Sequence, residues 1–175
     1  MSNITNNPRV YVGTYAKYNN GSIAGDWIDL DDYADDKEGF LKACAELHKD
    51  EDDPEFMFQD FEGFPREFYG ESRLSDELFT DWLPLDERER ALLAMFCEAS
   101  GYSGSDATWA NAEESFAGTA DSPADFAEQT AEDCGDIPSW IVIDWEASWN
   151  CNLRHDYHSP VRNDEDGLYY FFRSI

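Results

Sequence analysis

The sequence lacks any long apolar stretch. No run approaches the roughly 20 apolar residues that a helix needs to cross a bilayer. Residues 1–8 contain no basic region followed by an apolar run, so no signal peptide is expected. The 4 cysteines are widely spaced and form no CxxC pair, a pattern typical of reduced thiols. We therefore predict a soluble, cytoplasmic protein without a membrane partner.

The motifs of common catalytic sites are also missing. There is no GxSxG nucleophile elbow, no GxxxxGK[ST] phosphate loop and no GxGxxG dinucleotide fingerprint. Pairs of carboxylates can support glycoside hydrolysis, but among 39 acidic residues such pairs arise by chance. We predict that the protein is not an enzyme and uses no cofactor.

Metal-binding motifs are incomplete. Residues 163–167 resemble part of a calcium loop, but this alignment places Arg162 and Arg173 at the first and last ligand positions, where a cation cannot coordinate calcium. The acidic run 50–53 lacks the glycine of such a loop. Three potential zinc ligands have no fourth partner at a typical spacing: Cys151, His155 and His158. We predict no metal site.

Basic residues are scarce. The chain has 12 lysines and arginines against 39 acidic residues, a formal net charge of −27. This charge is spread along the chain, with −9 over residues 1–61, −6 over 62–100 and −12 over 101–175. Hydrophobic residues make up 42% and aromatic residues 15% of the sequence, whereas acidic disordered segments are poor in both. The chain is therefore expected to fold, although its charges repel one another.

A folded protein with this charge is best suited to a basic partner. Nucleic acids and anionic membranes repel such a surface, whereas the basic groove of a DNA-binding protein attracts it. Because duplex DNA carries one charge per ~1.7 Å, 27 charges match roughly 46 Å of duplex. A compact globule of this length has a radius of gyration of about 16 Å, so charge matching favours an elongated chain or an end-to-end dimer. We hypothesise a decoy for DNA; adaptation to high salt is the alternative, and the aromatic content weighs against it.

The first part of the chain combines strand and helix signals. Segments 10–15 and 23–29 are rich in β-branched and aromatic residues, and the Asn19-Asn20-Gly21 turn between them is typical of a hairpin. A third strand is predicted over 55–62. A helix is predicted before it, because three apolar residues recur at helical spacing after an acidic start: Phe40, Cys44 and Leu47.

Helix signals dominate the middle of the chain. A short helix is predicted over 75–82 and ends before Pro84. Asp86, with Glu89 three residues later, resembles a capping box, and the helix that it begins is expected to end at Gly101.

The last part mixes both kinds of element. Segment 140–149 fits a strand by alternation and a helix by spacing, and its length and Pro138 start favour the helix. The other predicted elements are a helix through Trp109, Ala112 and Phe116, a helix capped by Ser122-Pro123, a turn at 163–167 and a strand over 168–173.

These signals predict an α+β fold, an elongated chain of three small domains. The predicted parts are a lead-in at 1–8, an α+β domain with an antiparallel sheet at 9–61, a helical domain at 62–101 and an α+β domain at 102–175.

Two blocks of residues carry a family resemblance. The run Val10-Tyr11-Val12-Gly13-Thr14-Tyr15-Ala16-Lys17-Tyr18-Asn19-Asn20-Gly21, followed by Gly25-Asp26-Trp27, resembles the opening of ArdA-type antirestriction proteins. The stretch from Ile137-Pro138 to Ile143-Asp144-Trp145-Glu146-Ala147 is similar to the antirestriction motif region of that family. The spacing of the blocks extends the resemblance over nearly the whole chain after residue 8.

The resemblance implies a function and partners. It implies three small domains, an acidic face that mimics DNA, and a homodimer formed through the third domain. The implied target is a type I restriction-modification enzyme, whose DNA-binding groove the mimic occupies. One departure concerns the dimer: residues 149–153 read WNCNL where relatives tend to have an A-R-D-L-like run. Two alternatives remain, a mimic directed at another DNA-binding protein and a salt-adapted acidic domain.

Partner binding is predicted to be distributed over many carboxylates. Acids at predicted helix starts, such as Asp35 and Asp86, are interpreted as caps. The partner-binding candidates lack such a role: Asp26, Asp29, Asp60, Glu62, Asp81, Glu113, Glu114, Asp125, Glu128 and Glu132. The aromatic residues of 140–149 fit most simply a core, or else a dimer interface, because interfaces favour Trp and Tyr. The interface candidates are Trp140, Ile141, Asp144, Trp145 and Trp149.

Overall fold

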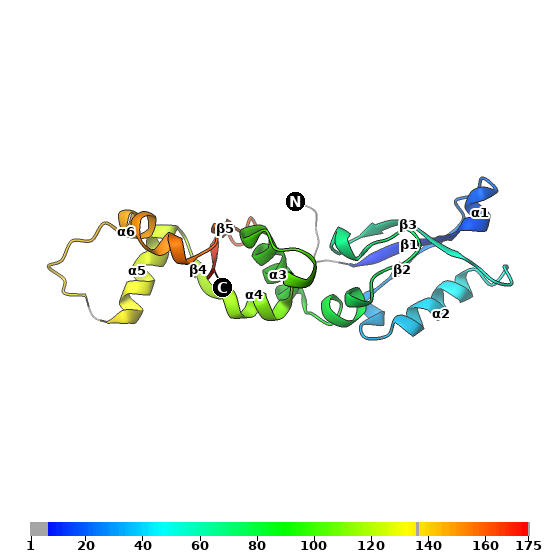
Figure 1. Cartoon of the computed structure of the whole chain (residues 1–175), viewed down its shortest axis with the longest axis horizontal. Helices are drawn as coiled ribbons and strands as arrows, with labels where there is room; N and C mark the ends of the chain where they lie inside the picture. Colours follow the sequence, from blue (N-terminus) through cyan, green and yellow to red (C-terminus); the bar gives the residue numbers. More distant parts are fainter. Residues whose placement is uncertain (1–6, 136, 175) are drawn as a thin grey trace. The chain divides into compact units, whose positions relative to one another are not determined.

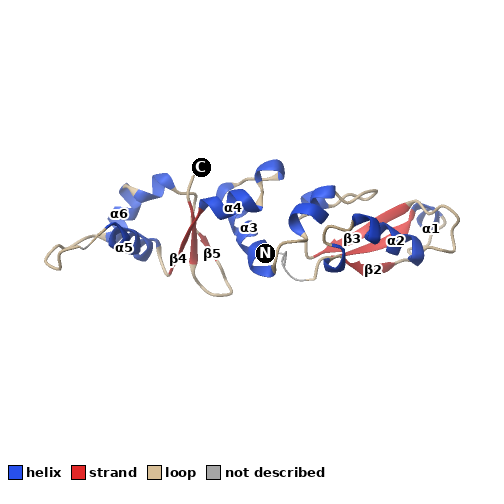
Figure 2. Ribbon diagram, turned by 90° about the horizontal axis from the view of Figure 1, so that it is seen from below, coloured by secondary structure: helices blue, strands red, loops and turns tan. Residues whose placement is uncertain are grey.

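The computed structural model describes residues 7–135 and 137–174 (Figure 1). The chain separates into two compact units, Met1–Ala91 and Leu92–Ile175, and the boundary in the sequence falls within helix α3 (Glu87–Ser100). Each unit contains helices and one small antiparallel sheet (Figure 2), so the predicted α+β class is confirmed. The division into three domains at residues 62 and 101 stays a prediction. No described helix is long and apolar enough to cross a membrane.

Unit 1 is built on a three-stranded sheet of order β2-β1-β3. The central strand β1 (Arg9–Thr14) pairs antiparallel with β2 (Asp26–Asp29) and β3 (Phe56–Glu62), as the alternation of the sequence predicts. The first strand ends at Thr14 because its hydroxyl accepts a hydrogen bond from the Lys17 N–H and caps a short helix that was not predicted, α1 (Tyr15–Asn19).

The second strand is shorter than predicted. The carbonyls of Ile23 and Gly25 accept hydrogen bonds from the Tyr11 hydroxyl, 3.0 Å each, and the ladder begins only at Asp26. A Cβ atom on Gly25 would lie 2.2 Å from the Val12 carbonyl oxygen, so only glycine fits at this close approach.

Helix α2 (Lys37–Leu47) covers one face of this sheet. Its Phe40 and Cys44 are buried together with Val10, Val12 and Phe58 of the strands, which confirms the helix predicted from apolar spacing. The cap is Asp36, whose carboxylate accepts from the Gly39 N–H at 2.8 Å, and not Asp35 as predicted. Asp35 instead takes a left-handed conformation, with φ of 59°.

Unit 1 ends with the short helices η2 (Arg66–Phe68) and η3 (Leu78–Trp82) and the start of α3. The predicted capping box is confirmed: the Glu89 N–H donates to the Asp86 carboxylate at 2.9 Å, and the Asp86 N–H donates to that of Glu89 at 2.8 Å. Inside this turn Arg90 is buried, and its guanidinium lies 4.4 Å from the centre of the Trp82 ring.

Unit 2 contains a second three-stranded sheet, of order β4-β6-β5. Its strands are β4 (Phe116–Ala120), β5 (Val161–Arg162) and β6 (Tyr169–Phe172), all antiparallel. Its helices are α4 (Trp109–Ser115), α5 (Pro123–Cys134), α6 (Trp145–Cys151) and the short helices η4 (Gly104–Asp106) and η5 (Leu153–Asp156).

Two predicted boundaries in unit 2 were wrong. Phe116 was assigned to a helix but begins β4, where it pairs with Phe172. The helix predicted from residue 140 begins only at Trp145, because the Asp144 carboxylate accepts from the Ala147 N–H at 2.9 Å and caps it there. The residues before this cap, 141–143, are β-branched and have low helix propensity.

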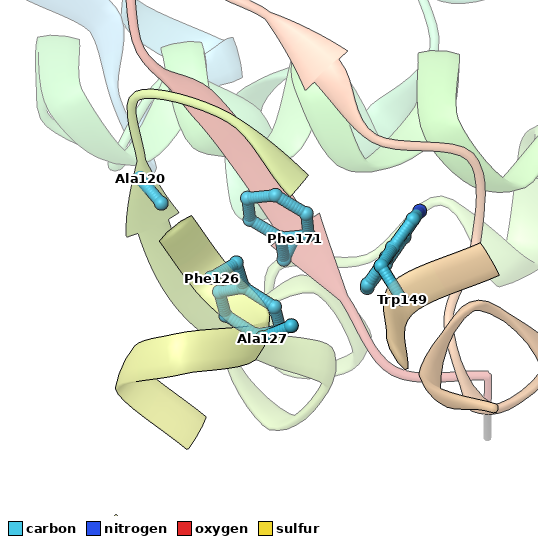
Figure 3. Packing of buried hydrophobic residues seen from close by; sticks show 5 residues of the cluster. All are labelled: Ala120, Phe126, Ala127, Trp149 and Phe171. Atoms are coloured by element: carbon cyan, nitrogen blue, oxygen red, sulfur yellow. The ribbon is translucent and has the colours of Figure 1, made fainter. Parts of the chain in front are cut away.

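A tight aromatic cluster forms a core of unit 2 (Figure 3). Phe126 of α5 stacks on Phe171 of β6 with ring centres 3.9 Å apart. Trp149 of α6 meets both rings edge-on, at 6.0 Å and 5.3 Å. The cluster therefore joins two helices and the sheet.

Candidate functional site

Both units are strongly acidic. Unit 1 has 23 acidic and 9 basic residues, a net charge of −14, and unit 2 has 16 and 3, a net charge of −13. Neither unit is an uncharged scaffold for the other. A basic partner could therefore be attracted to either unit.

The two units differ in how far their own cations neutralise them. Among the described residues, all eight ion pairs within 4 Å lie in unit 1. In the described part of unit 2, no carboxylate has a lysine, arginine or histidine nitrogen at that distance. The described acidic side chains of unit 2 are thus free of internal salt bridges that a basic partner would have to displace.

In unit 1, several candidate carboxylates gather on the face of the sheet opposite α2. Strand register places Asp29, Arg9 and Glu62 in one row across the three strands, and Trp27, Tyr11 and Asp60 in the next. The alternate residues Val10 and Val12 are buried beneath α2. We call the six residues of these two rows the outer sheet face.

Arg9 lies in the middle of the outer sheet face. Its guanidinium donates two hydrogen bonds to one oxygen of Glu62, at 2.7 and 2.8 Å, and lies 4.6 Å from the centre of the Trp27 ring. Glu62 was predicted to lack a structural role, and this pair gives it one. The prediction considered only acidic residues and therefore missed Arg9, although its alternation with Tyr11 places both on one face.

The remaining candidates of unit 1 are more isolated. Asp26 is exposed at the start of β2, and its carboxylate accepts from the neighbouring Trp27 N–H at 2.8 Å. Asp60 makes the same local contact with the Phe61 N–H. Asp81 is exposed on η3. The structure thus brings Asp29, Asp60 and Glu62 together but not Asp81.

In unit 2 the candidates lie on α4 and α5. Glu113 and Glu114 of α4 are exposed. On α5, Glu128 and Glu132 are exposed, whereas Phe126 and Ala127 face the core. The four-residue step between the two glutamates is a rise of about 6 Å, close to the ~6.8 Å by which two nucleotide steps of one strand advance along the DNA axis.

Asp125 has a structural role that sequence reasoning missed. It forms a capping pair at the start of α5: the Ser122 hydroxyl donates to its carboxylate at 2.6 Å, and its N–H donates to that hydroxyl at 3.2 Å. The signal was present, since Ser122 is followed three residues later by an acid. Asp125 is half-buried and is therefore a weaker candidate than Glu128 and Glu132.

The five dimer-interface candidates separate into two groups. Trp149 is only 6% exposed and belongs to the core cluster, Trp145 packs against that cluster, and Asp144 caps α6. In contrast, Trp140 and Ile141 are 81% and 42% exposed, in the loop before α6. Their neighbour Val142, which was not predicted, is 97% exposed.

One cluster has the composition of a metal site. Ligand atoms of His48, Asp50 and Glu51 lie within 4.8 Å of one another. The ammonium group of Lys17 already lies among them, 2.9 Å from His48 Nδ1, 2.9 Å from Asp50 and 3.4 Å from Glu51. His48 Nε2 lies 3.1 Å from the Val12 carbonyl oxygen, which only accepts hydrogen bonds. In this geometry the Nε2–H of His48 donates to that carbonyl, and Nδ1 accepts from the Lys17 ammonium group.

This arrangement predicts a pH-dependent effect of Lys17→Met. The hydrogen bond from Lys17 lowers the pKa of Asp50 and raises that of Lys17. The carboxylate contribution to stability is present above the unfolded pKa of Asp50 and is lost as pH falls through the folded value. The ammonium contribution is present below the unfolded pKa of Lys17 and is lost as pH rises through the folded value. We expect Lys17→Met to lower the melting temperature most at pH values between the pKa of Asp50 and the pKa of Lys17. The pKa of Asp50, measured by NMR titration, should rise in this variant.

The control is Lys42→Met. Lys42 is 78% exposed and lies 3.9 Å from Glu38. An equal loss of melting temperature in both variants would contradict a specific role for the Lys17 cluster.

Comparison with known proteins identifies the family. The model of the family described as "Antirestriction protein (ArdA)" matches residues 10–161. No curated protein and no solved structure gives a match. The matched range includes the outer sheet face except Arg9, the exposed glutamates of α4 and α5, and the loop before α6. Since it spans most of the 175 residues, the resemblance seen in the sequence is confirmed, and the chain belongs to the ArdA family of antirestriction proteins.

Proposed function

We propose that this protein inhibits type I restriction-modification enzymes by occupying their DNA-binding groove in place of DNA. Family membership supports the antirestriction role. The observation that carries the mimicry is the charge: both units are strongly acidic, and the described carboxylates of unit 2 form no internal ion pair. The protein acts as an inhibitor and not as an enzyme.

The mechanism follows from electrostatics. Surface carboxylates take the place of phosphates and contact the lysines and arginines that line the groove. Counterions are released from the groove, and the attraction between opposite fields raises the association rate. Binding should weaken steeply as salt rises, because each charge contact contributes to the salt dependence.

A competition titration tests the proposal. The protein is mixed with the methyltransferase core of a type I enzyme and labelled duplex DNA at several salt concentrations. Stoichiometric displacement of DNA that weakens steeply with salt is the expected result. Displacement from a different DNA-binding protein alone would favour another target. If no basic protein is bound and stability rises steeply with molar salt, the acidic surface is a salt adaptation.

Single substitutions should distinguish a distributed surface from a hot spot. We expect Asp26→Asn, Asp81→Asn or Glu113→Gln each to change the inhibition constant less than about threefold, since one contact among many is lost. Arg9→Gln should instead strengthen inhibition by a few fold, because it frees Glu62 and removes a cation from the outer sheet face. A tenfold loss of inhibition from the substitution of one acid, or weaker inhibition by Arg9→Gln, would contradict a distributed acidic binding surface.

We also propose a homodimer formed through residues 102–175. Trp140, Ile141 and Val142 support it, because three consecutive large apolar side chains are exposed in the loop before α6. We expect sedimentation of the wild type at twice the monomer mass and of Trp140→Ser/Val142→Ser at the monomer mass. Ile23→Ser, which removes an apolar side chain that is 72% exposed in unit 1, is the control. An unchanged dimer in the double variant would exclude this loop as the interface.

A further inference from the structure

Unit 1 contains an apolar groove outside the outer sheet face. It has a volume of about 340 Å³ and lies between α2, the start of β3 and residues 72–74. Its floor is formed by Phe40, Phe58 and Leu74, none more than 3% exposed. At its rim, Leu41 is 40% exposed and Phe56 is half-buried. The groove therefore offers an apolar surface that is open at its rim.

Charged side chains of both signs line the groove. Two cations, Lys37 and Arg73, line it, and both are paired with the carboxylate of Asp76. Glu55 also lines it and forms no ion pair with another described residue. The lining itself thus holds two positive side chains and one negative one, although unit 1 as a whole carries a net charge of −14.

We propose that this groove receives an uncharged apolar side chain of the basic protein that the acidic surface binds. The inference rests on the proposed function. The overall charge of unit 1 selects a basic partner, whereas the apolar floor of the groove selects an apolar group within it. An entering lysine or arginine would meet Lys37 and Arg73, which line the groove.

Such a contact adds a kind of affinity that the carboxylates do not supply. Charge contacts weaken as salt rises, because counterions compete for both surfaces. Burial of an apolar side chain is not screened by salt and is not expected to lose strength in this way. The groove would therefore hold the partner at salt concentrations that weaken the carboxylate contacts.

The test is Leu41→Gln, measured in full-length protein by displacement of labelled DNA from a type I methyltransferase core across a salt series. The substitution adds no charge, keeps a good helix former in α2 and changes an exposed side chain. We expect an affinity loss of roughly fivefold to tenfold at every salt concentration, with an unchanged slope of log affinity against log salt. The matched control is Ile23→Gln, an exposed apolar side chain in unit 1 outside the groove, which should change affinity less than about twofold.

The outcomes separate this inference from the proposed function. If the wild type does not displace DNA, the proposed function fails and the inference fails with it. If the wild type displaces DNA with a steep salt slope but Leu41→Gln equals it, the inference alone is wrong. Equal losses in Leu41→Gln and Ile23→Gln, or a changed slope, would also overturn it. A change in sedimentation mass confined to Leu41→Gln would assign the groove to a second copy instead. Unchanged melting temperatures of both variants exclude misfolding.

Discussion

A variant with Glu113, Glu114, Glu128 and Glu132 all replaced by glutamine is expected to displace DNA about a hundredfold less effectively at low salt than the wild type. All four side chains are exposed on α4 and α5, and none takes part in an ion pair or cap. Each lost contact with a basic groove removes one set of released counterions, so the salt slope should fall by about three to four. The measurement is the competition titration across a salt series.

The same variant carries an internal check on folding. Glu128 and Glu132 are like charges four residues apart on one helix, an arrangement that destabilises a helix by about 0.2–0.5 kcal/mol. Glutamine removes this repulsion without a loss of helix propensity. The variant should therefore inhibit less while its melting temperature stays the same or rises, which misfolding cannot produce.

A charge-balanced control makes the result specific. Replacing Glu38, Lys42, Glu46 and Lys49 by glutamine also removes four charges, but it leaves the net charge at −27. These residues pair with one another along and just after α2. We expect this control to inhibit like the wild type. If both quadruple variants were equally weak, or if the α4 and α5 variant kept its salt slope, the glutamates of α4 and α5 would not face the DNA-binding groove of the partner.

Arg90→Met is expected to lower the free energy of unfolding of unit 1 by about 2–4 kcal/mol. The Arg90 side chain is 7% exposed, and its Nη2 donates to Asp31 at 2.7 Å and to the Leu83 carbonyl at 2.6 Å. Methionine fills similar space but leaves that carbonyl without its donor. Asp31 is 51% exposed and can be rehydrated, so the loss should be smaller than for a fully buried ion pair.

Urea unfolding measures this effect, and the chain offers a matched control. Arg88 lies two residues earlier on α3 and is exposed. Arg88→Met should change the free energy of unfolding by less than about 0.5 kcal/mol. Because domains are stable by only about 5–15 kcal/mol, the loss in Arg90→Met is a large share of the total. A loss of unfolding free energy below about 1 kcal/mol would show that Arg90 does not stabilise the turn between η3 and α3.

Elements that depend on neighbouring residues were predictable. The apolar spacing of Phe40 and Cys44 predicted α2, and the Asp86 and Glu89 pair predicted the start of α3. The two opening strands and the Ser122 cap followed in the same way. These features rest on contacts within one or two turns or across one hairpin, so the sequence contains all the necessary information.

Competing local signals caused the errors. Asp35 and Asp36 are both acids at a helix start, and the sequence does not show which one has the extended backbone of a cap. Segment 140–149 has both strand and helix periodicity, and the Asp144 cap decides where α6 begins. Both errors shift an element boundary and leave the element itself in place.

By itself, the sequence determined that the protein is acidic along its whole length, that it folds into an α+β protein, and that it resembles a known family. The tertiary structure decided which carboxylates are available to a partner. Glu62 pairs with Arg9, 53 residues away, and Lys17 reaches Asp50 across 33 residues. Trp149 became part of the core, and the groove at Leu41 formed from segments far apart in the chain. The physical reason is that charge and periodicity are sums over neighbouring residues, whereas ion pairs and grooves depend on long-range packing that no local pattern encodes.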